Sequence, residues 1–237
     1  MANGSESASA AHDPALAPAR ERMLALLRDV ISDPRVIEAM AAVPRERFVP
    51  PELHRRAYDD NALPIGDDQT ISQPLIVAMM TEALALSPDD RVLEVGTGSG
   101  YQAAVLSRLA REVITVERLP HLLNSAQSRL AALNYENVHA FLAGDTLGRS
   151  EDAPYDAILV AAGAPHVPRT LIDQLAEGGR LVVPVGSRWS QELVRVTKTS
   201  HGVELARLGP CAFVPLVGKD AWHLDANGEA SRKPKVR

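Results

Sequence analysis

The chain has 237 residues, a hydrophobic content of 46% and a net charge of −5 at pH 7, which together suit one globular domain with a sizeable core. The negative charge argues against nucleic-acid binding as the main function, and the absence of a long uninterrupted apolar stretch argues against a membrane-spanning helix. Cys211 is the single cysteine, which excludes an intrachain disulfide and a cysteine metal cluster and favours the cytoplasm.

The first third of the sequence predicts an N-terminal layer of helices. Residues 1–18 are rich in Ala, Ser and Pro; they lack the basic start and apolar block of a secretory signal, and we expect a disordered tail. Helical spacing of apolar residues predicts helices at 20–31, 34–42 and 72–83, the last beginning at Ser72. Four prolines between 44 and 70 predict a loop-rich connection.

From residue 91 onward, aliphatic runs alternate with helical patterns. Strands are predicted at 91–95, 112–117, 138–142, 157–161 and 180–185, and helices at 101–110, 120–133 and 168–175. This alternation is typical of a doubly wound α/β fold, with a mainly parallel sheet and helices on both faces. Three further runs, at 192–198, 203–208 and 212–216, have no helices between them and predict antiparallel edge strands.

These patterns define one catalytic domain over 19–224. We expect the N-terminal helical layer to occupy 19–85 and the sheet core to occupy 86–224, followed by a flexible basic tail at 225–237. We also expect a monomer.

The segment Val92-Leu-Glu-Val-Gly-Thr-Gly-Ser-Gly100 joins a predicted strand to a predicted helix. Alternating glycines let the backbone turn tightly and approach a ligand, while the free N–H groups of the helix start face the same space. Dinucleotide enzymes favour the longer G-x-G-x-x-G spacing. The shorter Gly96-x-Gly98-x-Gly100 spacing, with Glu94 just before it, favours S-adenosylmethionine.

Two further positions complete this predicted cofactor site. Glu117 ends the second strand, where its carboxylate can accept both ribose hydroxyls of an adenosine, and Arg118 follows it. Gly144-Asp145 follows the third strand, where it can reach an adenine amine. The alternative interpretations are an exposed charge at Glu117 and a turn cap at Asp145.

Four segments resemble the protein-L-isoaspartate O-methyltransferase family, in its bacterial and archaeal form, over about residues 20–224. They are 43–50 (Val-Pro-Arg-Glu-Arg-Phe-Val-Pro), 69–74 (Gln-Thr-Ile-Ser-Gln-Pro), 92–102, and 153–158 continuing to 178–186. Segment 69–74 is the most specific, since general methyltransferases lack it. The resemblance implies a Rossmann-like class I methyltransferase fold and S-adenosyl-L-methionine as cofactor, with S-adenosyl-L-homocysteine as product.

What the resemblance further implies is repair of damaged proteins and peptides that contain L-isoaspartyl residues. Such enzymes methylate the free α-carboxylate of that residue, and the ester then closes to a succinimide that hydrolyses partly to normal aspartate. The carboxylate is already ionised at neutral pH, so no general base is required. Neither a metal nor a catalytic triad is therefore expected.

The resemblance also assigns site residues. Ser72 matches the family's active-site serine, with the N-cap of the third helix as the alternative interpretation of the same residue. The remaining matches are to the cofactor site or its adjoining wall: Thr70, Ile71, Glu94, Gly96, Thr97, Gly98, Ser99, Gly100, Glu117, Arg118, Gly144, Asp145 and Thr146. The chain departs from the family pattern at Asp68, Thr146 and Val217, which bears on substrate range and on the adenine edge.

Three other functions are compatible with parts of this pattern. A class I methyltransferase for a different carboxylate or a small molecule would keep the glycine segment. A non-catalytic module would bind S-adenosylmethionine without transferring the methyl group. A nicotinamide dehydrogenase is disfavoured by the glycine spacing. The presence of Ser72 beside a complete glycine segment favours the isoaspartyl enzyme.

Overall fold

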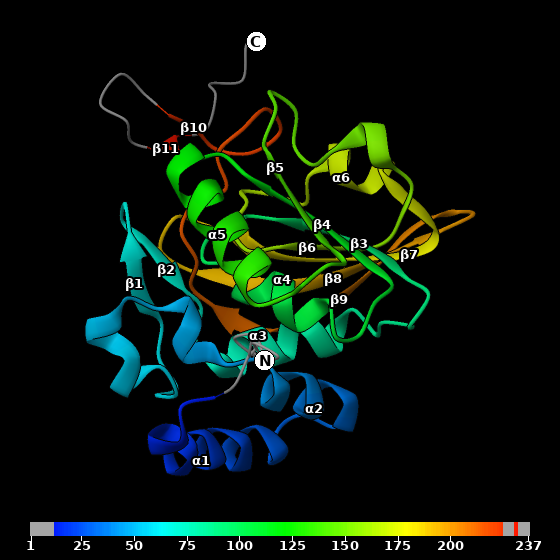
Figure 1. The fold of residues 1–237 in the computed structure, drawn as a ribbon. Coiled ribbons are helices and arrows are strands. Elements are labelled where there is room, and N and C mark those ends of the chain that lie inside the picture. Colours follow the sequence, from blue (N-terminus) through cyan, green and yellow to red (C-terminus); the bar gives the residue numbers. More distant parts are fainter. Residues whose placement is uncertain (1–11, 225–229, 232–237) are drawn as a thin grey trace, which may run out of the picture.

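A seven-stranded sheet runs through the centre of the computed structural model, which describes residues 12–224 and 230–231 (Figure 1). Its strands lie in the order β5-β4-β3-β6-β7-β8-β9. The first five of these are parallel to one another, and β8 and β9 are antiparallel additions at one edge. Their bounds are β3 Arg91–Val95, β4 Glu112–Glu117, β5 Val138–Leu142, β6 Tyr155–Val160, β7 Leu175–Gly186, β8 Gln191–Thr199 and β9 Gly202–Cys211.

The strand order places a topological switch point beside β3. The chain moves from β3 outward to β4 and β5, then returns to the other side of β3 as β6. In open α/β sheets the ligand crevice lies outside the carboxyl ends of the strands at such a point. The segments that follow β3, β4, β5 and β6 are therefore the ones that can surround a ligand.

Helices cover both faces of the sheet, as predicted. One face buries Val92, Val113 and Ala157 against apolar residues of α3 (Pro74–Ala83) and α4 (Tyr101–Leu106). The alternate residues of the same strands, such as Leu93 and Ile114, pack on the other face with α6 (Arg169–Asp173). A further covering helix, α5 (Pro120–Ala132), contacts β4 and β5. This alternation is what a sheet buried on both faces requires.

The N-terminal residues form a separate layer against α3, α4 and α5 (Figure 1). Its elements are η1 (Pro14–Leu16), α1 (Ala17–Arg28), α2 (Pro34–Ala42), η2 (Arg45–Phe48), η3 (Pro51–Arg56) and a hairpin of β1 (Leu63–Gly66) with β2 (Gln69–Ile71). Asp33 caps α2, because its carboxylate accepts the Arg35 N–H at 2.9 Å.

Several N-terminal boundaries differ from the sequence prediction. Residues 14–18 lie in η1 and the start of α1, so the expected disordered tail is wrong for them, whereas residues 1–11 lie outside the described part of the chain. The hairpin occupies part of the predicted loop at 44–70. It extends to Ile71, so α3 begins at Pro74 rather than at Ser72.

The later elements also differ in detail. Helix α4 ends at Leu106 rather than near 110, and Leu175 begins β7 instead of ending the preceding helix. Residues 212–216 were expected to form an edge strand, and this is wrong. Pro215, which has no N–H to donate to a ladder, makes only an isolated bridge with Gly163. Among the residues expected in a flexible C-terminal tail, Ala230–Ser231 pair as β11 with β10 (His223–Leu224), and 225–229 and 232–237 lie outside the described residues.

Candidate active site

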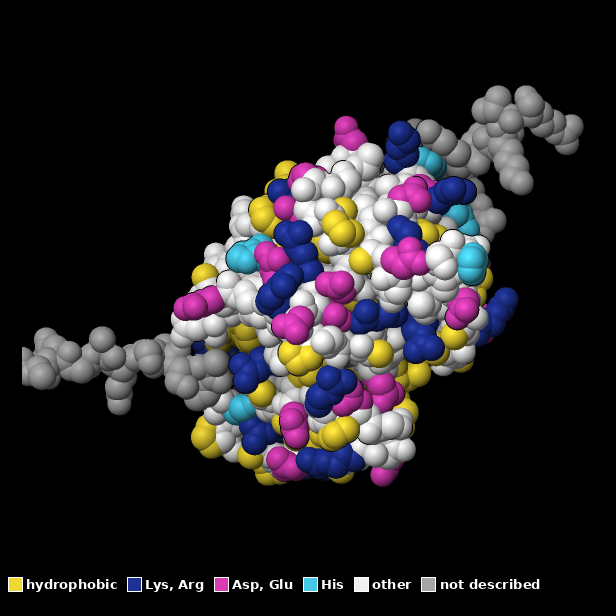
Figure 2. All heavy atoms as spheres, turned by 90° about the vertical axis from the view of Figure 1, so that its right-hand side faces the viewer, with side chains coloured by type: hydrophobic (Ala, Val, Ile, Leu, Met, Phe, Trp, Pro, Cys, Tyr) yellow, Lys and Arg dark blue, Asp and Glu magenta, His cyan; other side chains and the backbone are white. Residues whose placement is uncertain are grey.

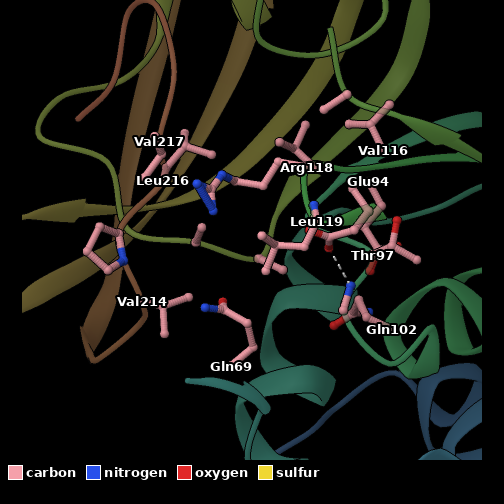
Figure 3. Close-up of a pocket in the computed structure, with 18 of the residues that line it drawn as sticks. Gln69, Glu94, Thr97, Gln102, Val116, Arg118, Leu119, Val214, Leu216 and Val217 are labelled. Atoms are coloured by element: carbon pink, nitrogen blue, oxygen red, sulfur yellow. Dashed lines mark hydrogen bonds between the residues drawn. The ribbon is translucent and has the colours of Figure 1, made fainter. Parts of the chain in front are cut away.

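A cavity of about 410 Å³ lies at the topological switch point, a volume typical of small-molecule sites. Its walls come from the β1–β2 hairpin and the link to α3, the glycine turn after β3, the ends of β4 and β5, and residues 214–218. In Figure 3, Val214, Leu216 and Val217 lie across the cavity from Glu94 and Thr97. Every residue predicted for the site lines this cavity except Gly100.

The glycine turn has a backbone that side chains would strain. Gly96 has φ +103° and Gly98 has φ +52°, both in the left-handed region that favours glycine. The Gly96 and Thr97 N–H groups donate to the carbonyl of Val116, so the turn is fixed to the end of β4. Gly100 also has positive φ but lies beneath the cavity, where a Cβ would stand 3.3 Å from Leu130 of α5. A glycine at position 100 therefore allows α4 to pack closely on α5.

Glu117 lies at the end of β4 beside this turn and is only 6% exposed. Its Oε2 accepts the N–H of Gly98 at 2.9 Å, and its Oε1 accepts the N–H of Leu119 at 3.0 Å. Each carboxylate oxygen offers about two acceptor positions. The carboxylate is thus held in one orientation while both oxygens keep capacity for a further donor, which is what two ribose hydroxyls require.

Glu94 is a fully buried carboxyl group within the same wall. The hydroxyl of Thr115 donates a hydrogen bond to the Oε2 of Glu94 at 2.5 Å. The same hydroxyl lies 2.7 Å from the hydroxyl of Thr97. The other oxygen of Glu94, Oε1, has no hydrogen-bond partner among the described residues. Burial raises the pKa of Glu94 to about 8, with the nearby Glu117 adding to the rise and the Thr115 hydrogen bond opposing it. A ligand or an ordered water can supply the donor that this buried acceptor lacks.

The opposite wall carries Ser72, which is half-buried between β2 and α3. The N-cap of α3 is Gln73, which makes no side-chain capping bond. Asp60 instead caps the first turn of α3. Its carboxylate accepts hydrogen bonds from the backbone N–H of Leu75 at 3.0 Å and from the side-chain amide of Gln73 at 2.6 Å. The structure therefore contradicts the interpretation of Ser72 as a helix cap. Ser72 instead lines the cavity.

The rim of the cavity carries charge of both signs. Asp145 and Thr146 are exposed beyond β5, and Arg118 is exposed beyond β4. Asp67 and Asp68 form the turn of the hairpin, both with positive φ, and both line the cavity. The carboxylate of Asp67 contacts the imidazole of His121, which joins this turn to the first residues of α5.

The sequence did not predict the C-terminal wall as a binding element. Residues 214–218 cross the cavity because Gly163, just after β6, donates its N–H to Val214 and accepts the Leu216 N–H, each at 2.8 Å. The indole of Trp222 donates to the same Gly163 carbonyl at 2.9 Å. These contacts join residues about fifty positions apart, and no local pattern signals them. The one indication in the sequence was that Val217 departs from the family pattern.

The described residues contain no group of three or more His, Cys, Asp or Glu side chains placed to hold a metal ion. Nor does any helix among them combine the length and apolar character needed to cross a membrane.

Comparisons with known proteins show the family to which the chain is similar. The family model described as protein-L-isoaspartate(D-aspartate) O-methyltransferase matches residues 19–221. A protein-L-isoaspartate O-methyltransferase 1 of Syntrophobacter fumaroxidans is 53% identical over 206 residues, covering 86% of this chain and 96% of its own. A protein-L-isoaspartate O-methyltransferase of Methanoregula boonei is 53% identical over 192 residues, covering 81% and 88%.

Two solved structures are also similar. One, a protein-L-isoaspartate O-methyltransferase, has a TM-score of 0.75 and 32% identity, and the match covers 85% of this chain and 67% of that one. The other, from Plasmodium falciparum, is assigned to the same enzyme class and is in complex with S-adenosyl-L-homocysteine. It has a TM-score of 0.73 and 27% identity, covering 82% and 96%.

Proposed function

Because the chain belongs to the protein-L-isoaspartate(D-aspartate) O-methyltransferase family, we propose that its cavity binds S-adenosyl-L-methionine beside Ser72 and there methylates L-isoaspartyl residues of damaged proteins and peptides. The enzyme is an S-adenosylmethionine-dependent carboxyl methyltransferase, and its product ester initiates repair through a succinimide. The observation that carries the proposal for the site is the juxtaposition of Ser72 and the glycine turn across one cavity.

The residues of the cavity fit the cofactor. S-Adenosylmethionine, when bound, supplies an electrophilic methyl group on a sulfonium sulfur. Glu117 would hold the ribose through its two oriented oxygens. The unpartnered Oε1 of Glu94 would accept from the ammonium at the amino-acid end. Gly144, Asp145 and Thr146, at the exposed rim, would border the adenine.

The acceptor side needs a hydroxyl rather than a base. The α-carboxylate of isoaspartate is ionised at neutral pH, so no proton has to be removed before attack. The Ser72 hydroxyl can donate one hydrogen bond to that carboxylate and hold one oxygen toward the cofactor side of the cavity. Thr70 and Ile71, the residues before it on β2, form the adjoining wall. Catalysis then rests on orientation and exclusion of water, and orientation can contribute about 7–11 kcal/mol.

We propose that the enzyme acts as a monomer, because residues of a single chain form all the walls described for the cavity. Basic and acidic side chains are interspersed on the face shown in Figure 2, and the whole chain carries a net charge of −5. The net charge supports a protein substrate rather than nucleic acid or an anionic membrane surface. The single cysteine, Cys211, supports a cytoplasmic location.

The test is methyl transfer from labelled S-adenosylmethionine to two peptides that differ only in an isoaspartyl or a normal aspartyl residue. We expect labelling of the isoaspartyl peptide and at most background labelling of the other. Equal labelling of both would favour a carboxyl methyltransferase of another specificity. Tight S-adenosylhomocysteine binding without any transfer would favour a non-catalytic binding module.

A further inference from the structure

Arg45 is a buried cation that the proposed reaction does not use. Its side chain is 0% exposed, and no carboxylate among the described residues lies within ion-pair distance of it. Desolvation lowers the pKa of its guanidinium, although the group remains charged. Burying a charge that has no ion-pair partner costs free energy. Stability alone is therefore a weak explanation for Arg45.

The contacts of Arg45 connect the two sides of the active site. Its Nη2 donates to the carbonyl of Ser72 at 2.7 Å, and its Nε donates to the carbonyl of Ala57 at 2.7 Å. Its guanidinium carbon lies 4.7 Å from the ring centre of Tyr101, within the range of a cation–π contact. Tyr101 is the first residue of α4, directly after Gly100. One planar group thus touches both the serine and the helix that follows the glycine turn.

The neighbours of Ser72 are held by other means. Ile71, before it, pairs with Leu63 across the hairpin. Gln73 and Leu75, after it, bond to Asp60. The backbone of Ser72 itself is held by the Arg45 bond to its carbonyl. This bond restrains the peptide plane that follows Ser72, and so the position of its Cα and Cβ relative to the cavity.

We propose that Arg45 is a positioning residue for methyl transfer, which fixes Ser72 relative to the start of α4 and so sets the gap between the substrate carboxylate and the cofactor. The inference rests on the proposed function. In-line transfer is sensitive to this gap, because a displacement of about 1 Å can cost roughly 100-fold in rate. Lysine cannot substitute fully, since an ammonium group is a compact donor and lacks the planar fork that joins two carbonyls and stacks on a ring.

The test is a double-mutant cycle between Arg45→Lys and Ser72→Ala, with kcat and KM measured on an isoaspartyl peptide and S-adenosylhomocysteine affinity measured by calorimetry. We expect Arg45→Lys to lower kcat by roughly tenfold or more while cofactor affinity changes by less than about twofold. In the Ser72→Ala background, Arg45→Lys should cost little more, because the residue acts through the serine. A purely structural role would give losses that multiply.

Leu27→Ala is the matched control. Leu27 is fully buried in α1 and belongs to the same apolar cluster as Tyr101. Its truncation should lower the melting temperature and leave kcat unchanged at the assay temperature. If Arg45→Lys fails to fold, Asp60→Ala provides the second test, because it releases the other side of the Ser72 segment and should show the same non-additivity with Ser72→Ala.

Multiplying losses, or an unchanged kcat in Arg45→Lys, would overturn this inference while leaving the proposed function intact. Failure of the unsubstituted enzyme to methylate the peptide would overturn both.

Discussion

The substitution Glu94→Gln should make the stability of the protein much less dependent on pH. Glu94 is fully buried, and its pKa rises from an ordinary value of 4.5 to about 8. The folded state therefore keeps a proton that the unfolded chain releases above pH 4.5. Stability is unaffected by this group below pH 4.5, falls as the pH rises from 4.5 to 8, and stays at the lower level above pH 8.

The size of the effect follows from that difference in pKa. One pKa unit corresponds to about 1.4 kcal/mol, so between pH 5 and pH 8 the wild type should lose on the order of 3 kcal/mol more than Glu94→Gln. The glutamine leaves an amide donor at the unpartnered Oε1 position, which costs about 1–3 kcal/mol but does not vary with pH. The test is therefore how the difference in unfolding free energy between the wild type and Glu94→Gln changes with pH, and not the size of that difference at any one pH.

The assay is urea unfolding of both proteins at pH 5, 6, 7 and 8. Thr115→Val, measured also at pH 9, provides an internal check in the opposite direction, since loss of the Thr115 hydrogen bond should raise the pKa of Glu94 further and extend the fall in stability above pH 8. A difference between wild type and Glu94→Gln that stays constant over this range would refute the account of a protonated buried carboxyl.

Three further substitutions test individual walls of the cavity. Glu117→Gln should weaken S-adenosylhomocysteine binding by roughly tenfold, because one of two oriented acceptors is lost; calorimetry that gives an unchanged affinity would contradict the ribose assignment. Ser72→Ala should lower kcat on an isoaspartyl peptide by roughly tenfold or more with nearly unchanged cofactor affinity. Equal kinetic constants for Ser72→Ala and the wild type would show that Ser72 has no role in methyl transfer. Asp68→Asn should lower KM roughly two- to fivefold for a peptide with acidic flanks at low salt, an advantage that should vanish near 1 M salt; a gain that persists at high salt would not be electrostatic.

The cofactor side of the site was largely predictable from the sequence because its signals are local. An aliphatic run, three glycines and a helical pattern are contiguous in residues 91–106, and Glu117 ends the neighbouring strand. The parallel sheet brings such strand ends together without further information. Residues 69–72 of the segment 69–74 likewise line the cavity, although they lie in β2 and the link that follows it, and α3 begins only at Pro74.

The remaining features depend on contacts between distant residues. The hairpin at 63–71 has a tight turn at Asp67 and Asp68, residues that tolerate positive φ but do not demand it. Arg45 reads locally as a surface charge, and its burial follows only from the packing of η2 against Tyr101. The path of 214–218 is set by Gly163 and Trp222. Neither propensity nor periodicity contains this information.

The proposed methyl acceptor is the α-carboxylate of an isoaspartyl residue held beside Ser72. Three peptides of one sequence test this assignment: one with isoaspartate, one with normal aspartate, and one with isoaspartate whose α-carboxyl is amidated. Labelled methyl transfer, followed by mass spectrometry, should find a base-labile ester on the first peptide alone. An ester on the amidated peptide would place the methyl group on another oxygen and contradict the account.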